Sequence, residues 1–371
     1  MIGFVARAWI AAGLLAALSA VALADAADGK RGVYAEDEAL RIGATIQRQL
    51  DPGEGPLMRE AGIDSVRFWL SWSDVESRHD QYDWGPVDQV VRQIATGGLT
   101  PVPFIFGSPE WSARRDGFFC SAPKCVPYAP STPETRAEFA EFAAIAVRRY
   151  GPGGTFWEHN IGIPYRPIGI WQVWNEPNLD AFYEPYVSPG RYAELVRATE
   201  AAIRAEDADA EVVLAGLSGN RTTSTHWSTQ EYLAAFYEVP QIEQSFDGIA
   251  IHPYASRVRG VMQRIATARE IAGAEDPGAE LWVTEIGWAS GGPKRWSLVK
   301  TPRLQARLLR RSFRRLIRHT EEWRLRGIYW YAWRDTPRGQ GVCPWCGRAG
   351  LRDREGGPKP AYDALADITS R

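Results

Sequence analysis

The chain has 371 residues, 45% of them hydrophobic and 24% charged, which is an ordinary composition for one large globular domain or two smaller ones. The formal net charge of −2 gives no reason to expect a nucleic acid or an anionic membrane as partner. The 16 tryptophans are unusual, because indole rings serve mainly as core volume or as platforms for flat apolar ligand faces, such as those of sugar rings.

The N-terminal residues have the pattern of an export signal. Arg7 precedes an apolar stretch over 8–23, and Ala22-Leu23-Ala24 supplies small residues for a cleavage site. The stretch is too short for a bilayer-spanning helix, although an uncleaved anchor is the alternative interpretation. We therefore expect a signal peptide over 1–24, a lead-in over 25–39, and a secreted, periplasmic or cell-surface protein without stable membrane insertion.

From residue 40 to residue 371, apolar runs alternate with amphipathic helical segments. Such alternation is typical of βα units around a parallel sheet, and eight parallel strands close a barrel. The predicted strands are 41–46, 65–70, 100–106, 168–174, 211–215, 248–251, 280–284 and 327–332. The sequence therefore predicts an α/β protein with a single (β/α)8 TIM barrel and loop insertions at the C-terminal face of the barrel.

The segments between these strands have helix signals. The segment 133–150 begins after Ser131-Thr132 and ends before Gly151, which are start and stop signals of a helix. The segment 303–326 has one apolar stripe and many arginines, as expected for the solvated outer face of a barrel helix. Between strands three and four, the aromatic segment 156–167 is predicted to shape a cleft.

The four cysteines form two local pairs, Cys120 with Cys125 and Cys343 with Cys346. In an exported chain, this spacing favours two disulfides that each close a short loop. A four-thiolate zinc site, cross-pairing, and thiol exchange at Cys343-Pro-Trp-Cys346 are the alternatives. Redox-active motifs of that kind begin a helix, whereas this one lies in a loop rich in Gly and Pro. No metal or organic cofactor is expected.

Two glutamates stand at the ends of apolar runs, Glu176 after strand four and Glu285 at strand seven. Three βα units of about 36 residues separate them, close to the roughly 30 residues typical of one unit. The carboxyl ends of parallel strands meet at one rim, so we expect both carboxyl groups there. A protonated acid and an ionised carboxylate are what retaining cleavage of a glycosidic bond requires. Arg67, inside an apolar strand, is a candidate cation beside Glu285, because a buried guanidinium needs a carboxylate partner.

Four motifs carry a resemblance to a known group of enzymes: Trp174-Asn175-Glu176-Pro177, Thr284-Glu285-Ile286-Gly287-Trp288, His252-Pro253-Tyr254, and Trp330 in the last strand. With these motifs the sequence resembles the clan A glycoside hydrolases, retaining (β/α)8 enzymes that include cellulases, β-xylosidases and α-iduronidases. The segments 66–69, 106–111 and 350–362 are most similar to glycoside hydrolase family 39, including bacterial exopolysaccharide endoglycosidases. Relatives in that family often carry a β-sandwich after the barrel, which this sequence does not show.

The resemblance implies roles for individual residues. It implies that Glu176 is the acid/base and Glu285 the nucleophile, that Asn175 contacts the sugar 2-hydroxyl, and that Tyr254 donates a hydrogen bond to the nucleophile. The remaining candidates for the substrate site, each with a structural role in the core or rim as the alternative, are Arg67, His252, Trp111, and Trp330 or Trp333 as the floor of the sugar subsite.

These observations predict a secreted glycoside hydrolase that cleaves a poly- or oligosaccharide by double displacement. It is expected to act as a monomer, with carboxyl groups about 5–5.5 Å apart. The alternatives are a carbohydrate-binding barrel without turnover and a thiol oxidoreductase that uses Cys343 and Cys346. The motifs leave open which glycan and linkage is cut, whether cleavage is internal or terminal, and whether water or a second sugar accepts the product.

Overall fold

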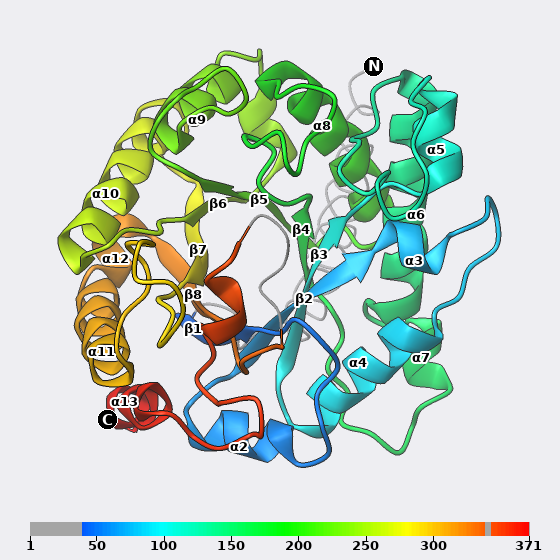
Figure 1. Cartoon of the computed structure of the whole chain (residues 1–371). Coiled ribbons are helices and arrows are strands. Elements are labelled where there is room, and N and C mark those ends of the chain that lie inside the picture. The colour runs from blue at the N-terminus through cyan, green and yellow to red at the C-terminus, as the bar shows by residue number, and fades with distance from the viewer. Residues whose placement is uncertain (1–38, 338–342, 371) are drawn as a thin grey trace, which may run out of the picture. The chain divides into compact units, whose positions relative to one another are not determined.

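The computed structural model describes residues 39–337 and 343–370. The predicted signal peptide over 1–24 and nearly all of the lead-in lie outside the described residues. The described part, from Leu40 onward, forms one compact unit (Figure 1). Within it, no helix has both the length and the apolar character needed to cross a membrane.

Eight parallel strands close into a barrel in sequence order, with the last strand paired to the first, and the helices surround them (Figure 1). Every predicted strand is confirmed, with ends that differ by a few residues. The strands are β1 (Arg41–Thr45), β2 (Ser65–Ser71), β3 (Thr100–Phe106), β4 (Ile170–Val173), β5 (Glu211–Ser218), β6 (Gly248–His252), β7 (Glu280–Ile286) and β8 (Leu325–Tyr331). The predicted (β/α)8 barrel is therefore the observed fold.

Side chains fill the lower part of the barrel interior. Six buried residues form a cluster inside it, with the rings of Trp282 and Tyr329 stacked at 6.3 Å between centroids. Small residues make room for these rings: a Cβ added at Gly248 would lie 2.7 Å from the Trp282 indole. The interior is thus a packed core, and the space for a ligand lies at the rim above it.

The helices pack outside the barrel. They are α2 (Glu54–Glu60), α3 (Trp72–Val75), α4 (Gly85–Thr96), α5 (Glu110–Arg115), α6 (Pro133–Tyr150), α7 (Thr155–Glu158), α8 (Pro189–Glu206), α9 (Thr229–Tyr237), α10 (Val258–Glu275), α11 (Pro302–Arg318), α12 (Thr320–Trp323) and α13 (Pro360–Thr369), with 3-10 turns η1 (Ile242–Ser245) and η2 (Cys346–Arg348). The predicted helix over 133–150 is confirmed as α6, and the Thr132 hydroxyl caps its first turn.

Two predictions about segments are wrong. The segment 303–326 is not one helix: α11 ends at Arg318, Arg324 has a left-handed backbone (φ 50°), and β8 begins at the next residue. The aromatic segment 156–167 does not shape the cleft either. Phe156 and Trp157 are buried beside Tyr150 in α7, which precedes β4, whereas a barrel's site is built from the loops that follow the strands.

Candidate active site

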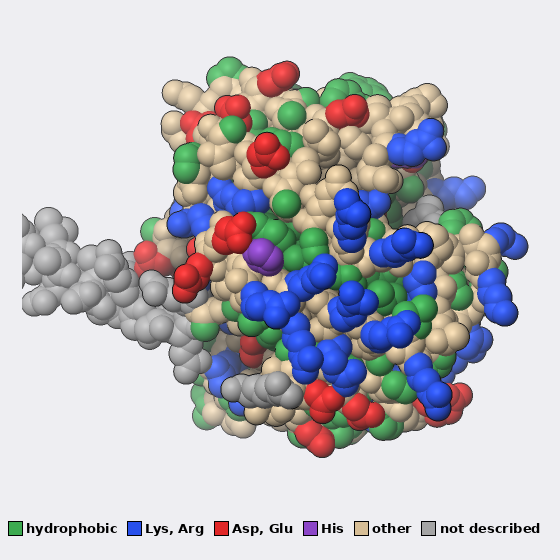
Figure 2. Space-filling model, turned by 90° about the vertical axis from the view of Figure 1, so that its left-hand side faces the viewer, with side chains coloured by type: hydrophobic (Ala, Val, Ile, Leu, Met, Phe, Trp, Pro, Cys, Tyr) green, Lys and Arg blue, Asp and Glu red, His purple; other side chains and the backbone are tan. Residues whose placement is uncertain are grey.

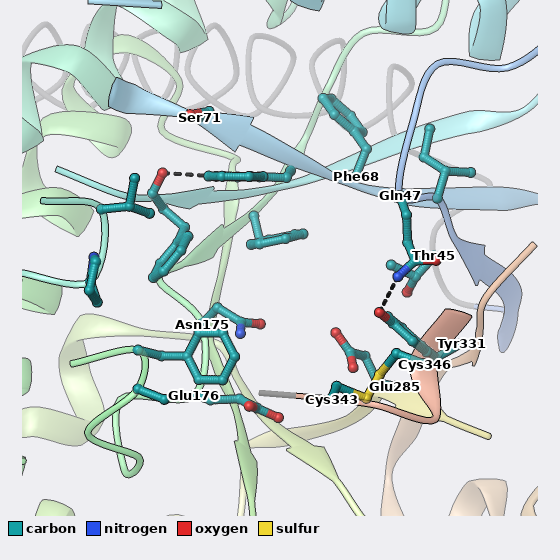
Figure 3. A pocket seen from close by; sticks show the side chains of 18 of the residues that line it. Thr45, Gln47, Phe68, Ser71, Asn175, Glu176, Glu285, Tyr331, Cys343 and Cys346 are labelled. Atoms are coloured by element: carbon teal, nitrogen blue, oxygen red, sulfur yellow. Dashed lines mark hydrogen bonds between the residues drawn. A yellow bond between two sulfur atoms is a disulfide. The ribbon is translucent and has the colours of Figure 1, made fainter. Parts of the chain in front are cut away.

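The two predicted glutamates lie close together at the C-terminal rim of the barrel. Glu285 is in β7, and Glu176 is three residues beyond the end of β4. One carboxylate oxygen of Glu176 and one of Glu285 are within 4.8 Å of each other. Figure 3 shows both side chains directed into the same cavity. The sequence spacing therefore placed both carboxyl groups at one site.

A sharp turn after β4 presents Glu176 to this cavity. Both Trp174 (φ 73°) and Glu176 (φ 43°) have left-handed backbone conformations, which strain residues with a side chain and cluster at functional sites. The buried Trp174 holds the turn in place: its amide donates to the Ile105 carbonyl at 2.8 Å, and its indole N–H donates to the Phe182 carbonyl at 2.8 Å. The strained backbone is thus fixed by packing and hydrogen bonds on both sides.

Glu285 accepts two strong hydrogen bonds. The Arg67 guanidinium donates to Oε1 at 2.7 Å, and the Tyr254 hydroxyl donates to Oε2 at 2.7 Å. Burial, and next the negative charge of Glu285, raise the pKa of Tyr254 well above its usual value, so this phenol remains a donor. A cation and a neutral donor therefore hold the carboxylate from two sides.

Arg67 is fully buried under the cavity and is not one of the residues that line it. Its other nitrogens donate to Gln172 Oε1 at 2.7 Å and to Asn175 Oδ1 at 3.0 Å. Its guanidinium carbon also lies 4.0 Å from the centre of the Phe104 ring. The predicted cation beside Glu285 is present, and it acts by holding Glu285 and Asn175. Arg67 was also expected among the substrate-binding residues, but here its side chain lies below the lining of the cleft.

His252 is the partner of Glu176. Its Nδ1 lies 2.7 Å from Glu176 Oε1 and 3.7 Å from Glu285 Oε2, and its Nε2 lies 3.1 Å from the Thr284 hydroxyl. The imidazole is only 1% exposed and does not line the cavity, so it too contacts a carboxyl group in place of a substrate. Depending on its tautomer, Nδ1 can donate to a carboxylate or accept from a carboxylic acid.

In the part of the chain that the structure describes, two groups of side chains are close enough together to hold a metal ion: Glu176, His252 and Glu285, and separately Glu76, His79 and Asp80. In the first group the contacting atoms already have the protein partners described above. In the second group Glu76 accepts from the Trp72 indole at 2.7 Å and from the Asp80 amide at 2.9 Å. The first group is thus two neighbouring carboxyl groups, one of which, Glu176, is hydrogen-bonded to the His252 imidazole.

The carboxyl groups open into a cleft of about 760 Å³, within the range of roughly 300–1,000 Å³ typical of ligand sites. Loops that follow the barrel strands line it, and Asn175, Glu176, Tyr254 and Glu285 are among the lining residues. One wall is aromatic: Trp69 is 40% exposed, and its indole N–H is fixed by the Phe106 carbonyl at 2.9 Å. Such a ring is a rigid platform for the apolar face of a sugar.

The expected tryptophan floor is wrong. Trp330 (0% exposed) and Trp333 (2% exposed) do not line the cleft. Trp330 points outward to Phe313 of α11, and its N–H donates to the Ala349 carbonyl. Trp111 also lies outside the lining, with its N–H on the Glu76 carbonyl. All three are structural, because each donor is satisfied inside the protein.

Both local disulfides are present, between Cys120 and Cys125 and between Cys343 and Cys346. The second borders the cleft, as Figure 3 shows, and it holds a tryptophan that sequence reasoning missed. Trp345, inside the Cys-Pro-Trp-Cys loop, also lines the cleft and packs edge-on against Tyr254, with 5.0 Å between ring centroids. The closely spaced cysteines were the one available signal for it.

Gln47 and Tyr331 form another missed pair. The Gln47 amide donates to the Tyr331 hydroxyl across the cleft mouth, and both residues line the cleft (Figure 3). Burial, and next the charge of Glu285, raise the pKa of Tyr331, so its phenol stays protonated. These residues follow β1 and end β8, where no motif singled them out.

Comparison with known proteins supports an assignment. Residues 168–343 match the family model described as glycosyl hydrolase catalytic core. No curated protein sequence is similar to the chain. Among solved structures, it is similar to a monomeric β-xylosidase from Caulobacter crescentus CB15 (20% identity, TM-score 0.59, 89% of this chain and 71% of that one).

Two further solved structures have the same fold. They are a GH39 enzyme from Xanthomonas axonopodis pv. citri (19% identity, TM-score 0.60, 89% of this chain and 66% of that one) and an exo-β-1,4-mannosidase from Opitutaceae bacterium strain TAV5 (17% identity, TM-score 0.56, 90% and 59%). At these levels of sequence identity, the structural similarity establishes the fold alone. The segment that matches the glycosyl hydrolase catalytic core also carries Glu176 and Glu285, and the whole described part has the (β/α)8 fold of these solved glycosidases.

Proposed function

We propose that the protein hydrolyses a poly- or oligosaccharide with retention of anomeric configuration, with Glu285 as nucleophile and Glu176 as acid/base. The observation that carries this proposal is the separation of the two carboxylates, which have oxygens within 4.8 Å of each other. Retaining enzymes need about 5–5.5 Å between the two groups, whereas inverting enzymes need about 6.5–9.5 Å to admit a water molecule.

The environments of the two glutamates fit different roles. Glu285 has a guanidinium and a phenol as donors, so its negative charge is compensated where it must attack carbon. Among the described residues, the His252 imidazole is the only side chain hydrogen-bonded to Glu176, and it can face either protonation state of the carboxyl group. This asymmetry supports attack by Glu285 and proton transfer by Glu176.

In the first step, Glu285 attacks the anomeric carbon while the bond from that carbon to the leaving oxygen breaks. Glu176 gives its proton to that oxygen, so the first product departs as an alcohol. In the second step, Glu176 takes a proton from water, the water oxygen bonds to the anomeric carbon, and the ester bond to Glu285 breaks. Two inversions give net retention, and both carboxyl groups return to their starting states.

Other residues of the cleft would bind the sugar. Asn175 is held by Arg67 through its Oδ1, which leaves its Nδ2 to donate to a sugar hydroxyl beside the anomeric carbon. The exposed face of Trp69 would stack on a second unit of the glycan. The similar solved structures include a β-xylosidase and an exo-β-1,4-mannosidase, so β-xylosides and β-1,4-mannosides are among the substrates to test.

The mechanism is tested by Glu176→Gln and Glu285→Gln, assayed on a panel of aryl glycosides and polysaccharides. We expect either change to lower kcat by on the order of 10³-fold or more while the thermal midpoint stays near that of the wild type. Glu238→Gln, an exposed glutamate at the end of α9, is the matched control and should retain full activity.

Proton NMR of the first product formed decides the stereochemistry. Retention supports the double displacement, whereas release of the inverted anomer would refute it. Strong destabilisation of both glutamine variants with unchanged turnover would instead show that the glutamates have only a structural role.

We also propose that the protein is exported, on the basis of the N-terminal signal pattern and the two disulfides, which form in oxidising compartments. Expressed with its own N-terminus in a secreting bacterial host, the mature protein should begin near Asp25. N-terminal sequencing measures this directly, and an intact Met1 on protein recovered from the cytoplasm would contradict the proposal.

A further inference from the structure

The charges of this nearly neutral chain are strongly segregated. Between Gly287 and His319 the sequence has ten Lys and Arg residues and no Asp or Glu. This segment comprises the loop after β7 and helix α11. Figure 2 shows Lys and Arg side chains gathered on the side of the molecule that carries α9 to α11. A net charge of −2 therefore hides one strongly basic face.

Most of these cations have no counter-ion. On α11, Arg310 pairs with Asp367 at 2.7 Å. The other six arginines of this helix have no ion-pair partner among the described residues: Arg303, Arg307, Arg311, Arg314, Arg315 and Arg318. An amphipathic helix needs polar residues on its solvent-facing side. That requirement alone does not explain why the charged residues of this side are all positive.

A second, independent feature lies beside this face. Ser256, Arg257, Ser297 and Lys300 surround a pocket of about 410 Å³, with Leu304 and Leu308 of α11 as its apolar side. The two cations repel each other there: burial and the positive charge of Arg257 both lower the pKa of Lys300. None of the described residues that line the pocket has a carboxylate. Two like charges, two hydroxyls and an apolar side are a suitable set of contacts for an anionic ligand with hydroxyl groups.

The loops that form this pocket follow barrel strands, as those of the catalytic cleft do. Arg257 is three residues beyond Tyr254, and Lys300 is in the loop that follows β7, the strand of Glu285. Both loops come after barrel strands, so the pocket and the cleft open on the same end of the barrel. Trp296, one residue before Ser297, is 39% exposed and offers a stacking face for a sugar. A single extended polymer can therefore reach both places.

The cleft has the opposite charge. Among its described lining residues are five carboxyl groups, from Asp74, Asp83, Glu176, Asp180 and Glu285, and one guanidinium, from Arg48, which is already paired with Asp51. A polyanion is disfavoured in the cleft and favoured on the basic face. Anionic groups on a glycan would thus bind on the basic face and stay out of the cleft.

We propose that the Arg257–Lys300 pocket and the adjoining α11 face bind an acidic polysaccharide, and that this surface anchors the enzyme on a glycan that carries carboxylate, sulfate or phosphate groups. The choice of a glycan over another polyanion rests on the proposed function. The surface is separate from the catalytic pair, so it sets where the enzyme binds and leaves the chemical step to the two glutamates.

Binding of polygalacturonate to the full mature protein tests this, by calorimetry at low salt, with neutral dextran, duplex DNA and phosphatidylglycerol vesicles compared in parallel. We expect Arg257→Ala/Lys300→Ala to weaken polygalacturonate binding by on the order of 10-fold. Arg78→Ala/Lys124→Ala, which removes the same charge from exposed positions elsewhere, should leave it unchanged. Lys300→Arg, which keeps the charge, should retain binding if the alanine variant loses it.

Equal binding by the wild type and Arg257→Ala/Lys300→Ala would overturn the proposal, as would tighter binding of DNA or vesicles than of polygalacturonate. The assay needs no turnover. A protein that binds polygalacturonate but cleaves no glycan would refute the proposed function alone, and an active glycosidase that ignores polygalacturonate would refute this inference alone.

Discussion

The Tyr254→Phe variant removes a single oxygen from the site and isolates one of the two hydrogen bonds to Glu285. In the proposed covalent intermediate, Glu285 is an uncharged ester, and it regains its negative charge as the ester bond breaks. The Tyr254 hydroxyl, 2.7 Å from Oε2, then donates to a developing carboxylate. A hydrogen bond to a charged group contributes about 1.5–3 kcal/mol, so its loss should slow this second step about 10- to 150-fold.

The first step should change less, because the same hydrogen bond stabilises the carboxylate before attack and is partly lost as the charge is consumed. An activated aryl glycoside with a good leaving group separates the steps, since the first step releases the phenol. We expect Tyr254→Phe to give a burst of phenol followed by slow turnover, with the glycosyl-enzyme visible by intact-protein mass spectrometry. Equal slowing of both steps, without accumulation of the intermediate, would refute this reasoning.

Three further outcomes are expected. Trp345 contacts Tyr254, so we expect Trp345→Ala to lower kcat by disturbing Tyr254. The double variant Tyr254→Phe/Trp345→Ala should then lose no more kcat than Tyr254→Phe alone. Additive losses of kcat in this double-mutant cycle would show an independent role of Trp345. Arg67→Met removes the buried donor to Gln172 and one of the two donors to Glu285, and it should cost about 3–5 kcal/mol in urea unfolding. A loss under about 1 kcal/mol would contradict the role of the buried guanidinium. Burial, and next the charge of Glu280, raise the pKa of Glu211 to about 8, so folding favours its protonated form and stability is lost as pH rises from about 4.5 towards 8. Glu211→Gln should therefore be more stable than the wild type at pH 9 and no more stable at pH 4, as measured by thermal unfolding at both pH values.

The barrel and the catalytic pair were predictable because both follow from strand patterning. A buried parallel strand is an apolar run, and its end fixes the rim on which the next polar residues lie. This logic placed Glu176 and Glu285 correctly without any knowledge of loops. The same logic predicted that Arg67 lies beside a carboxylate, because a charged side chain in a buried strand needs an oppositely charged partner.

The tryptophans were harder to assign, because a motif does not give the direction of a side chain. Neighbouring residues of a strand point to opposite sides, so Trp330 cannot share the interior with both Tyr329 and Tyr331. Counting this alternation from Tyr331 would have placed Trp330 outside, against α11. Trp345 lines the cleft because of the geometry of its loop, which strand periodicity does not describe. Trp69, by contrast, is in β2 two residues beyond the buried Arg67, so the same alternation places both side chains on one face of the strand.

The error over the segment 156–167 has a similar origin. Its aromatic residues attracted attention, but its position between α6 and β4 already decides the matter. Segments that lead from a helix into a strand lie at the opposite end of a barrel from those that leave a strand. Chain order is therefore a better guide to the cleft than composition.

The Cys343–Cys346 bond has a consequence for how the enzyme matures. The bond closes the loop that carries Trp345, and this ring forms a wall of the cleft against Tyr254. The barrel core does not depend on that loop, so we expect the chain to fold before the bond forms. A newly made, reduced chain would then be a folded precursor with an unfinished active site, and oxidation outside the cytoplasm would complete it. Under the proposed export, full activity would thus be acquired only after the protein has left the compartment in which it was made.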